Sequence, residues 1–207
     1  MIKVAEPTIE RLVQYHRLLE RLQDEGQRVI SSQQMGDLLG IKASQVRKDL
    51  SYFGEIGKRG VGYHVGRLYE HVFRILASPK TWKVALAGAG NLGLALIGHS
   101  AFKNQNFCVE ALFDVDPQKV NREIAGVHCW HFDDMTAQLQ EKKIEILILA
   151  VPASAAQLCV DRAVSSGMIR GILSFSPTTV ITPEDVLVYS VDVFAELEKL
   201  LFYLKTD

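Results

Sequence analysis

The chain has 207 residues, of which 48% are hydrophobic and 23% charged, and its formal net charge is −1. This is the composition of an ordinary globular protein, which excludes collagen-like and low-complexity chains. The length allows one large domain or two small ones, since a domain has about 150 residues. No basic and apolar leader opens the sequence, and no apolar run reaches the ~18 residues that span a bilayer, so we expect a cytoplasmic protein without a membrane partner.

Charge divides the sequence into two unlike parts. Residues 1–80 hold thirteen Lys and Arg against nine Asp and Glu, whereas residues 81–207 hold ten against fifteen. A basic first part indicates a polyanionic partner for that part alone. We therefore expect one domain at residues 1–80, a second at residues 81–191 and a C-terminal segment at residues 192–207, with a linker at residues 78–80.

Apolar residues at helical spacing predict the elements of the first domain. One helix runs from Thr8 to Gly26, and a short extended piece follows at residues 28–30. A second helix is capped by Ser31 or Ser32 and ends at Gly40, with Met35, Leu38 and Leu39 facing inward. A third starts near residue 44 and continues to about residue 53, and a fourth covers residues 68–76. The second and third helices, joined by a tight turn that contains glycine, predict a helix-turn-helix.

The outer face of the third helix has the residue types that contact DNA. Val46, Leu50 and Phe53 share its inner face by the i, i+4, i+7 rule, which leaves the polar residues outside. The second helix of a helix-turn-helix lies in the major groove. The DNA-contacting residues predicted around this helix are Lys42, Ser44, Gln45, Arg47 and Lys48. The alternative is a solvated basic face that binds another protein.

Residues 54–65 predict a hairpin wing, because they combine four glycines, two adjacent cations and alternating apolar residues. Cations at the tip of such a loop can contact phosphates, and a narrow minor groove attracts Arg. We expect Lys58, Arg59, Gly60 and Tyr63 to contact DNA.

Residues 84–96 predict a strand, a tight turn and a helix, with G-x-G-x-x-G spacing at the turn. Gly88 permits the turn, Gly90 lets a pyrophosphate approach the backbone, and Gly93 lets the helix pack on the strand. The helix N-terminus then offers N–H groups to the anion. A glycine-rich turn without a ligand is the alternative.

A second apolar segment, residues 107–113, ends at Asp114, twenty-six positions after Gly88. A dinucleotide fold places there the carboxylate that binds the adenosine ribose. A carboxylate repels a 2′-phosphate, so NAD(H) is favoured over NADP(H). The alternative makes Asp114 only a part of an Asp-Val-Asp-Pro turn.

The rest of the second domain alternates strands and helices. Strands are expected at residues 127–132, 144–151, 171–175 and 186–190, with helices at about 133–142 and 154–166. This predicts an α/β domain with a five- or six-stranded, largely parallel sheet. Val151 and Pro152 lie at the carboxyl end of the buried strand at residues 144–151, so they face the crevice where such sheets bind ligands.

The sequence gives little indication of disulfides, metal binding or catalysis. Cys108, Cys129 and Cys159 lack a C-x-x-C pair and are expected to be reduced core thiols. His128, Cys129 and His131 cluster without further ligands, so we expect no metal site. No G-x-S-x-G motif or substrate domain is evident, so no catalytic residue is assigned and we do not expect an enzyme.

Four segments of the sequence resemble a known family. Ser-Gln-Val-Arg-Lys-Asp-Leu-Ser-Tyr-Phe-Gly (44–54) and Gly-Lys-Arg-Gly-Val-Gly-Tyr (57–63) resemble the DNA-binding module of the Rex family of redox-sensing transcriptional repressors. Gly-Ala-Gly-Asn-Leu-Gly (88–93) and Phe-Asp-Val-Asp-Pro (113–117) resemble its nucleotide-binding core. The resemblance implies a winged-helix domain, a Rossmann domain and a C-terminal helix that crosses into the other subunit. It further implies a homodimer that senses the NADH/NAD+ ratio, binds a palindromic double-stranded operator and leaves it when NADH is bound.

The resemblance also implies roles for single residues. The predicted cofactor contacts are Gly88, Ala89, Gly90, Asn91, Leu92, Gly93, Asp114, Val151, Pro152, Ser174 and Phe175. Arg17 and Asp192 match residues that pair across subunits and couple the nucleotide to domain orientation. The chain departs from the family at His99, where Tyr is expected, and at Ser-Phe-Ser-Pro (174–177), where Asn-Phe-Ala-Pro is expected. His99 either titrates near neutral pH and alters the switch, or fills the same space as Tyr.

The C-terminal segment independently indicates a partner subunit. After Asp192, which can cap a helix, apolar residues cover more of the helix than one sheet face would bury. A helix packed on its own sheet is the alternative. Two further hypotheses for the whole chain remain open: an NAD-dependent oxidoreductase with an added basic domain, and a repressor controlled by another nucleotide.

Overall fold

The computed structural model describes residues 4–54, 62–78, 80–99 and 106–205. The chain forms two compact units, Met1–Pro79 and Lys80–Asp207, and each is described by itself. None of the helices within the described ranges has the length and apolar content that a membrane span requires.

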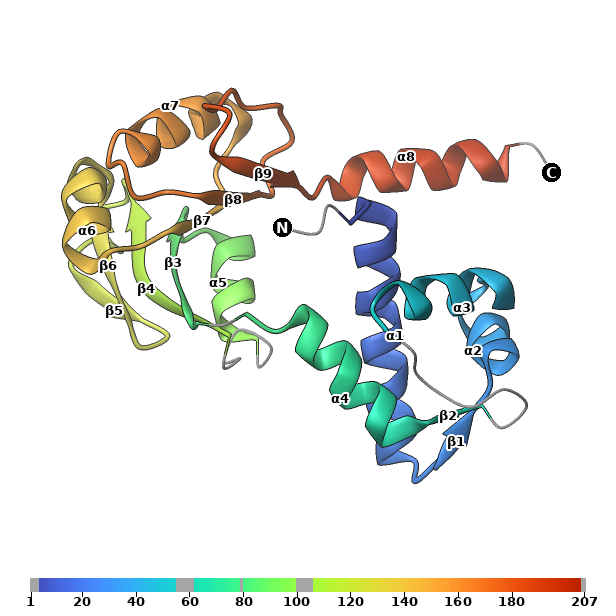
Figure 1. Ribbon diagram of the computed structural model, residues 1–207. Coiled ribbons are helices and arrows are strands. Elements are labelled where there is room, and N and C mark those ends of the chain that lie inside the picture. The colour runs from blue at the N-terminus through green and yellow to red at the C-terminus, as the bar shows by residue number, and fades with distance from the viewer. Residues whose placement is uncertain (1–3, 55–61, 79, 100–105, 206–207) are drawn as a thin grey trace. The chain divides into compact units, whose positions relative to one another are not determined.

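Unit 1 is a helical domain with a two-stranded antiparallel ribbon (Figure 1). Its elements are α1 (Glu6–Asp24), β1 (Val29–Ile30), α2 (Ser32–Leu39), α3 (Ala43–Tyr52), β2 (Tyr63–His64) and α4 (Val65–Leu76). The four predicted helices are confirmed, and α4 begins three residues earlier than expected. The end of the predicted wing, β2, pairs with β1, with Ile30 opposite Tyr63. Residues 55–61 of that wing lie outside the described residues.

Helix α2 begins and ends as its sequence predicts. The side chain of Ser31 accepts a hydrogen bond from the backbone N–H of Gln34, and the Gln34 side chain accepts one from the N–H of Ser31, which forms a capping box. Gly40 ends the helix in the left-handed region at φ 68°. The prediction that Leu38 faces inward is wrong, because Met35 and Leu39 define the inner face at i, i+4 spacing and Leu38 lies beside it, exposed.

Unit 2 is an α/β domain around a seven-stranded sheet of order β5-β6-β4-β3-β7-β8-β9. The strands are β3 (Trp82–Ala87), β4 (Phe107–Asp114), β5 (Arg122–Ile124), β6 (Val127–His131), β7 (Ile146–Leu149), β8 (Gly171–Ser174) and β9 (Leu187–Ser190). The helices are α5 (Asn91–Gly98), α6 (Met135–Lys142), α7 (Ala153–Val164) and α8 (Val193–Leu204), and a 3-10 turn (Phe132–Asp134) precedes α6. All strand pairs are parallel except the β5–β6 hairpin.

The sheet is buried on both faces, which explains its continuous apolar strands. Along β3, Ala85 and Ala87 belong to a core that includes buried residues of α6 and α7. Val84 and Leu86 belong to the opposite core, which includes Ile97 of α5. The helices therefore cover both faces, and the carboxyl ends of β3, β4 and β7 remain available for a ligand site.

Two sequence predictions for unit 2 are wrong. The sheet has seven strands, because the three-residue β5 is too short and too polar to predict. Its hairpin turn has Ala125 and Gly126 at φ 52° and 81°, the backbone of a type I′ turn. Cys108 is an exposed thiol at the start of β4 and no core residue, whereas Cys129 and Cys159 are buried as expected; all three are free.

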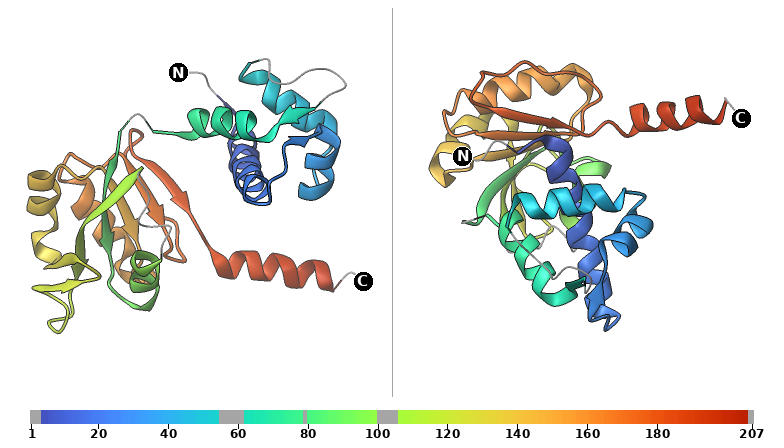
Figure 2. Two further views of the ribbon diagram at one scale, coloured as in Figure 1. Left: turned by 90° about the horizontal axis from the view of Figure 1, so that it is seen from below. Right: turned by 45° about the vertical axis from the view of Figure 1, so that its right-hand side comes forward.

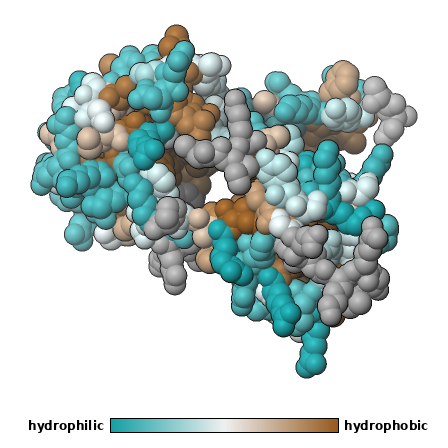
Figure 3. All heavy atoms as spheres, in the orientation of Figure 1, coloured by the Kyte–Doolittle hydropathy of each residue, from teal (hydrophilic) through white to brown (hydrophobic). Residues whose placement is uncertain are grey.

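Helix α8 continues from β9 away from the sheet (Figures 1 and 2). Asp192 caps it as predicted, since its carboxylate accepts the backbone N–H groups of Phe194 and Ala195 at 3.0 Å. No residue of α8 is buried, and brown and tan atoms are visible on its surface in Figure 3. Its exposed apolar residues are Val193, Phe194, Leu197, Leu200, Leu201, Phe202, Tyr203 and Leu204.

Candidate functional site

The glycine turn between β3 and α5 needs two of its three glycines for packing. Gly88 has φ 95°, and a Cβ there would lie 2.3 Å from the carbonyl oxygen of Ala150. A Cβ on Gly93 would lie 2.1 Å from the carbonyl oxygen of Gly88. Both positions therefore exclude any side chain, as the strand-turn-helix prediction requires.

Gly90 is different. It is the N-cap of α5 with an ordinary φ of −79°, and a Cβ placed on it meets no atom within 4 Å. Neither packing nor backbone conformation therefore requires glycine here. The open space lies at the N-terminus of α5, where unpaired N–H groups attract an anion. The absence of a Cβ at Gly90 leaves room for a pyrophosphate to approach the backbone.

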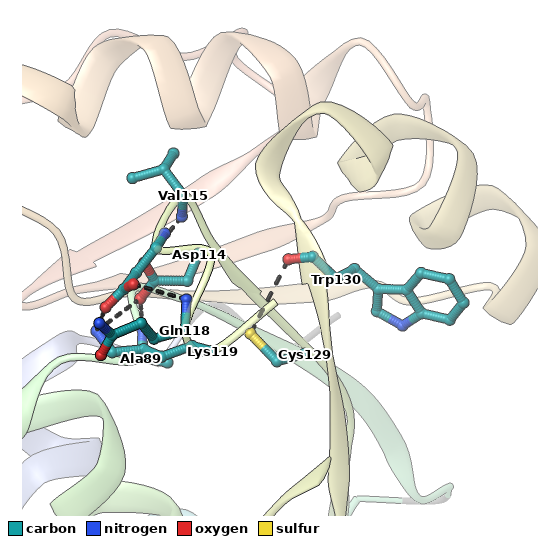
Figure 4. A network of polar contacts seen from close by, with 8 residues as sticks. Ala89, Asp114, Val115, Gln118, Lys119, Cys129 and Trp130 are labelled. Atoms are coloured by element: carbon teal, nitrogen blue, oxygen red, sulfur yellow. Dashed lines mark hydrogen bonds and ion pairs between the residues drawn. The ribbon is translucent and has the colours of Figure 1, made fainter. Parts of the chain in front are cut away.

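Asp114 ends β4 and ties the glycine turn to the neighbouring strand (Figure 4). Its Oδ2 accepts the backbone N–H of Ala89 at 2.8 Å, and its Oδ1 accepts those of Val115 and Asp116 at 2.8 and 2.9 Å. The Lys119 ammonium lies 3.5 Å from Oδ2. Asp114 is therefore part of a turn, as the alternative interpretation held, and this turn also supports the glycine loop.

Asp114 remains ionised in this setting. Burial by itself raises the pKa of a carboxyl group. The hydrogen bonds from the N–H groups of Asp116 and Ala89, together with the positive charge of Lys119, outweigh burial and hold the pKa of Asp114 below its usual value. A fixed negative charge therefore stands beside the glycine turn.

A cavity of about 330 Å³ opens at the carboxyl ends of β3, β4 and β7. Five of the predicted cofactor residues line it: Gly88, Gly90, Asp114, Val151 and Pro152. The walls also contain Phe113, Val115, Phe132, Leu158 and Cys159. The site thus combines an anion-binding helix end, one carboxylate and apolar walls, which suits a nucleotide.

The other predicted cofactor residues do not line this cavity. Asn91 and Leu92 are exposed in the first turn of α5, whereas Ala89 in the glycine turn and Gly93 in α5 are buried. Ser174 is completely buried at the end of β8, and Phe175 is half-buried in the core on the α5 face.

Sequence reasoning missed one charged and several apolar residues of the site. Lys119 lies 3.5 and 3.4 Å from Asp114 and Asp116 and lines the cavity. Ala155, Leu158 and Cys159 reach the cavity from α7 at i, i+3, i+4 spacing, a pattern that was visible after Pro152. Burial raises the pKa of the Cys159 thiol to about 11. The thiol therefore stays protonated and lines the cavity as an apolar group, without acting as a nucleophile.

The predicted DNA face of α3 is mostly exposed. Lys42, Ser44, Arg47 and Lys48 lie at the surface, and Arg47 donates from Nη1 to Oγ of Ser32 on α2 at 3.0 Å. Tyr63 is half-buried in β2. The predicted contacts Lys58, Arg59 and Gly60 lie outside the described residues.

Gln45 does not point freely outward as expected. It is half-buried, and its Nε2 donates to Oδ1 of Asp49 at 2.8 Å. Asp49 is itself only 3% exposed and also binds Arg11 and Tyr15 of α1. The partners of Asp49 lie 34 and 38 positions away in the chain, so no local sequence pattern indicates that this carboxylate is buried.

The three residues predicted to couple nucleotide and DNA lie at the surface or near it. Arg17 is exposed on α1, and His99 is exposed immediately after α5. Asp192 is half-buried, with its carboxylate engaged as the cap of α8.

Comparison with known proteins decides the family. Residues 3–51 match the model of the "Putative DNA-binding protein N-terminus" family, and residues 79–178 match the "CoA binding domain" family. The redox-sensing transcriptional repressor Rex of Carboxydothermus hydrogenoformans is 41% identical over 205 residues, which are 99% of this chain and 98% of that protein. The chain belongs to the Rex family of redox-sensing transcriptional repressors. Rex 1 of Thermotoga maritima is 42% identical over 97% of this chain and 95% of its own length.

Solved structures of a Rex-family repressor, RSP, have the same fold. RSP in complex with β-NAD+ and operator DNA matches with a TM-score of 0.91 and 33% identity, covering 100% of this chain and 94% of that one. RSP in complex with β-NADH matches with a TM-score of 0.89 and 32% identity, covering 100% and 96%. The predicted fold class is confirmed: an N-terminal DNA-binding domain, a Rossmann-like parallel sheet and a C-terminal helix.

Proposed function

We propose that the chain is a homodimeric repressor that binds a palindromic operator and releases it when NADH occupies the cavity at the glycine turn. The observation that carries this proposal is the open Cβ position of Gly90 beside the ionised Asp114. The complexes of RSP with operator DNA and with NADH support the same pair of ligands.

The dinucleotide would bind along the carboxyl ends of the strands. The N–H groups at the start of α5 suit the pyrophosphate, and the apolar wall that includes Phe132 and Leu158 suits an adenine ring. Asp114 would accept ribose hydroxyls in place of its 3.5 Å contact with Lys119, and its charge would disfavour a 2′-phosphate. Lys119 does not reverse this charge, because it contacts both Asp114 and Asp116.

Ligand discrimination follows from charge. Reduced nicotinamide is neutral and oxidised nicotinamide is positive, so the two forms differ in the cost of burial. A ligand shifts an equilibrium only by its difference in affinity between the two states. We propose that the closed dimer binds NADH better, and that its recognition helices no longer match the spacing of the operator half-sites.

The DNA contacts are proposed on α3 and the wing. Lys42, Arg47, Lys48, Lys58 and Arg59 supply positive charge for phosphates or base edges. Ser44, Gln45, Gly60 and Tyr63 complete the set taken from the sequence. Two copies of this surface related by a two-fold axis suit a palindrome.

The occupant of the exposed apolar face of α8 is, in this proposal, a second copy of the chain. Eight apolar residues of the helix are exposed within one copy, and such a face in water favours association. The resemblance to Rex adds that the helix crosses into the partner, with Asp192 near Arg17 of the partner subunit. We accordingly propose residues 1–80, 81–191 and 192–207 as DNA-binding, dinucleotide-binding and dimerisation segments.

We further propose a cytoplasmic, non-catalytic protein. The relatives are named as repressors, and the titratable residues of the cavity are engaged. Asp114 and Lys119 bind one another, and the Cys159 thiol has its pKa raised by burial. An oxidoreductase would instead need a free acid or base there.

Fluorescence titration tests the proposal. NADH and NAD+ are titrated into the protein alone, and then in the presence of a duplex that the protein has selected from a random-sequence library. We expect tight NADH binding that the duplex weakens, with no oxidation of NADH by carbonyl compounds. Turnover with a carbonyl substrate would favour an oxidoreductase, and absence of NADH binding would favour control by another nucleotide.

A further inference from the structure

A buried carboxylate lies under the helix that is proposed to read DNA. Asp49 faces inward from α3, and its Oδ2 accepts from Nε of Arg11 at 2.6 Å and from the Tyr15 hydroxyl at 2.9 Å. Its Oδ1 accepts from Nη2 of Arg11 at 2.9 Å and from Nε2 of Gln45 at 2.8 Å. Four donors thus saturate one carboxylate, two of them from a single guanidinium.

This arrangement is more specific than helix packing requires. Apolar residues of α1 and α3, such as Leu12 and Val46, already form a common core. A buried ion pair adds little stability compared with an apolar pair of equal size, but it is directional and tolerates only one relative position of its partners. Hydrogen bonds from Nε and Nη2 of Arg11 fix α3 against α1 in rotation and along its axis.

The carboxylate also determines how Gln45 is presented. A carboxylate accepts hydrogen bonds and donates none, so the amide nitrogen of Gln45 must face Asp49 and its oxygen must face away. Gln45 lies in the first turn of α3, the part of a recognition helix that contacts base edges. Ser44 and Lys48, exposed on the same helix, depend on the same placement.

We propose that Asp49 is a positioning residue for operator recognition, which holds α3 on α1 through Arg11 and Tyr15 and fixes the amide orientation of Gln45. The inference rests on the proposed function of α3. It assigns to Asp49 no contact with DNA.

The chain contains a matched control. On α2, Nε2 of Gln33 donates to Oδ1 of Asp37 at 2.8 Å, with the same four-residue spacing as Gln45 and Asp49. Both residues of that pair are exposed. Asp37→Asn therefore removes the same charge from the same half of the chain without disturbing a buried carboxylate.

The experiment compares dissociation constants for a selected duplex and for a scrambled duplex of equal length, at one salt concentration and below the unfolding temperature. The duplex is one that the full-length wild-type chain selects from a random library. The specificity ratio is the dissociation constant for scrambled DNA divided by that for the selected duplex. We expect Asp49→Asn to reduce this ratio about tenfold, which is the effect of losing one specific base contact. Affinity for scrambled DNA should not fall, and Asp37→Asn should keep the wild-type ratio.

Tyr15→Phe deletes one hydrogen bond to Asp49 and keeps Arg11, and Tyr15 has no proposed contact with DNA, so this variant serves if Asp49→Asn does not fold. It should also lower the preference for the selected duplex. A wild-type ratio in all variants that fold would overturn the inference and leave the proposed function intact. A wild-type chain that selects no duplex at all would overturn the proposed function together with the inference.

Discussion

The backbone N–H of Ala89 donates a 2.8 Å hydrogen bond to Oδ2 of Asp114. The bond joins the middle of the glycine turn to the end of the neighbouring strand, so one carboxylate both shapes the loop and stands beside the cavity. The loop that would hold a pyrophosphate and the group that would hold a ribose are therefore mechanically one unit. This coupling makes the site preorganised, which lowers the entropic cost of binding a dinucleotide.

Gly90 and Gly93 of the turn should respond differently to alanine. Gly90→Ala should fold like the wild type, because its Cβ meets no atom within 4 Å, yet lose NADH affinity. Gly93→Ala should lower the free energy of unfolding by about 1–3 kcal/mol or more, because its Cβ would lie 2.1 Å from a carbonyl oxygen. Thermal unfolding and NADH fluorescence titration measure the two effects. Unchanged NADH affinity in Gly90→Ala would contradict a pyrophosphate at this turn.

Asp114→Asn should weaken NADH binding about tenfold or more, since a hydrogen bond to a charged group is worth roughly 1.5–3 kcal/mol. Its control is Asp116→Asn, which also removes a charge near Lys119 but leaves the bond between Ala89 and Asp114 intact. NADH titration at constant salt distinguishes the variants. Equal losses of NADH affinity in Asp114→Asn and Asp116→Asn would mean that only the local negative charge matters, and would contradict a specific role for Asp114.

Acid should selectively remove the contribution of Asp49. Burial raises its pKa, but hydrogen bonds from Arg11, Gln45 and Tyr15 outweigh burial and lower the pKa below the usual value. A carboxyl whose folded pKa is lowered contributes stability above its unfolded pKa of about 4, and this contribution disappears as the pH falls through the folded pKa. The midpoint of thermal unfolding of the wild type should therefore approach that of Asp49→Asn as the pH falls below about 4. A difference between the two unfolding midpoints that does not change with pH would contradict an ionised Asp49.

Leu197→Glu on α8 should dissociate the proposed dimer without unfolding the chain, because Leu197 is exposed within one copy. Placing a charge in an apolar interface costs several kcal/mol, which converts a micromolar dimer into a monomer at ordinary concentrations. Sedimentation velocity measures the oligomeric state of each variant. Glu198→Gln, also exposed on α8, is the control and should remain dimeric. A monomeric wild type, or a dimeric Leu197→Glu, would disprove the proposed role of α8.

Local chemistry made much of this fold predictable. The turn at residues 88–93, a serine cap at Ser31 or Ser32 and the cap of Asp192 depend on residues within a few positions of one another. The structure has the turn and the Asp192 cap, and Ser31 is the serine that caps α2. The carboxylate Asp114 was placed by its spacing from Gly88, and it lies where the parallel strands bring it.

Features that depend on distant partners were not predictable. Asp49 appears in the sequence as one charge among basic neighbours, and only the packing of α1 on α3 brings Arg11 and Tyr15 to it. Lys119 likewise reaches the cavity through the turn that follows β4. The polar strand β5 forms because a two-residue turn folds it onto β6, with no apolar alternation of its own.

Binding of a selected palindromic duplex, measured at constant salt while NADH is raised to millimolar concentration, tests the central claim most directly. The account predicts that NADH releases the duplex, that NAD+ at equal concentration releases far less, and that Gly90→Ala keeps the duplex bound with either nucleotide. Duplex binding that is indifferent to NADH throughout this range would contradict it.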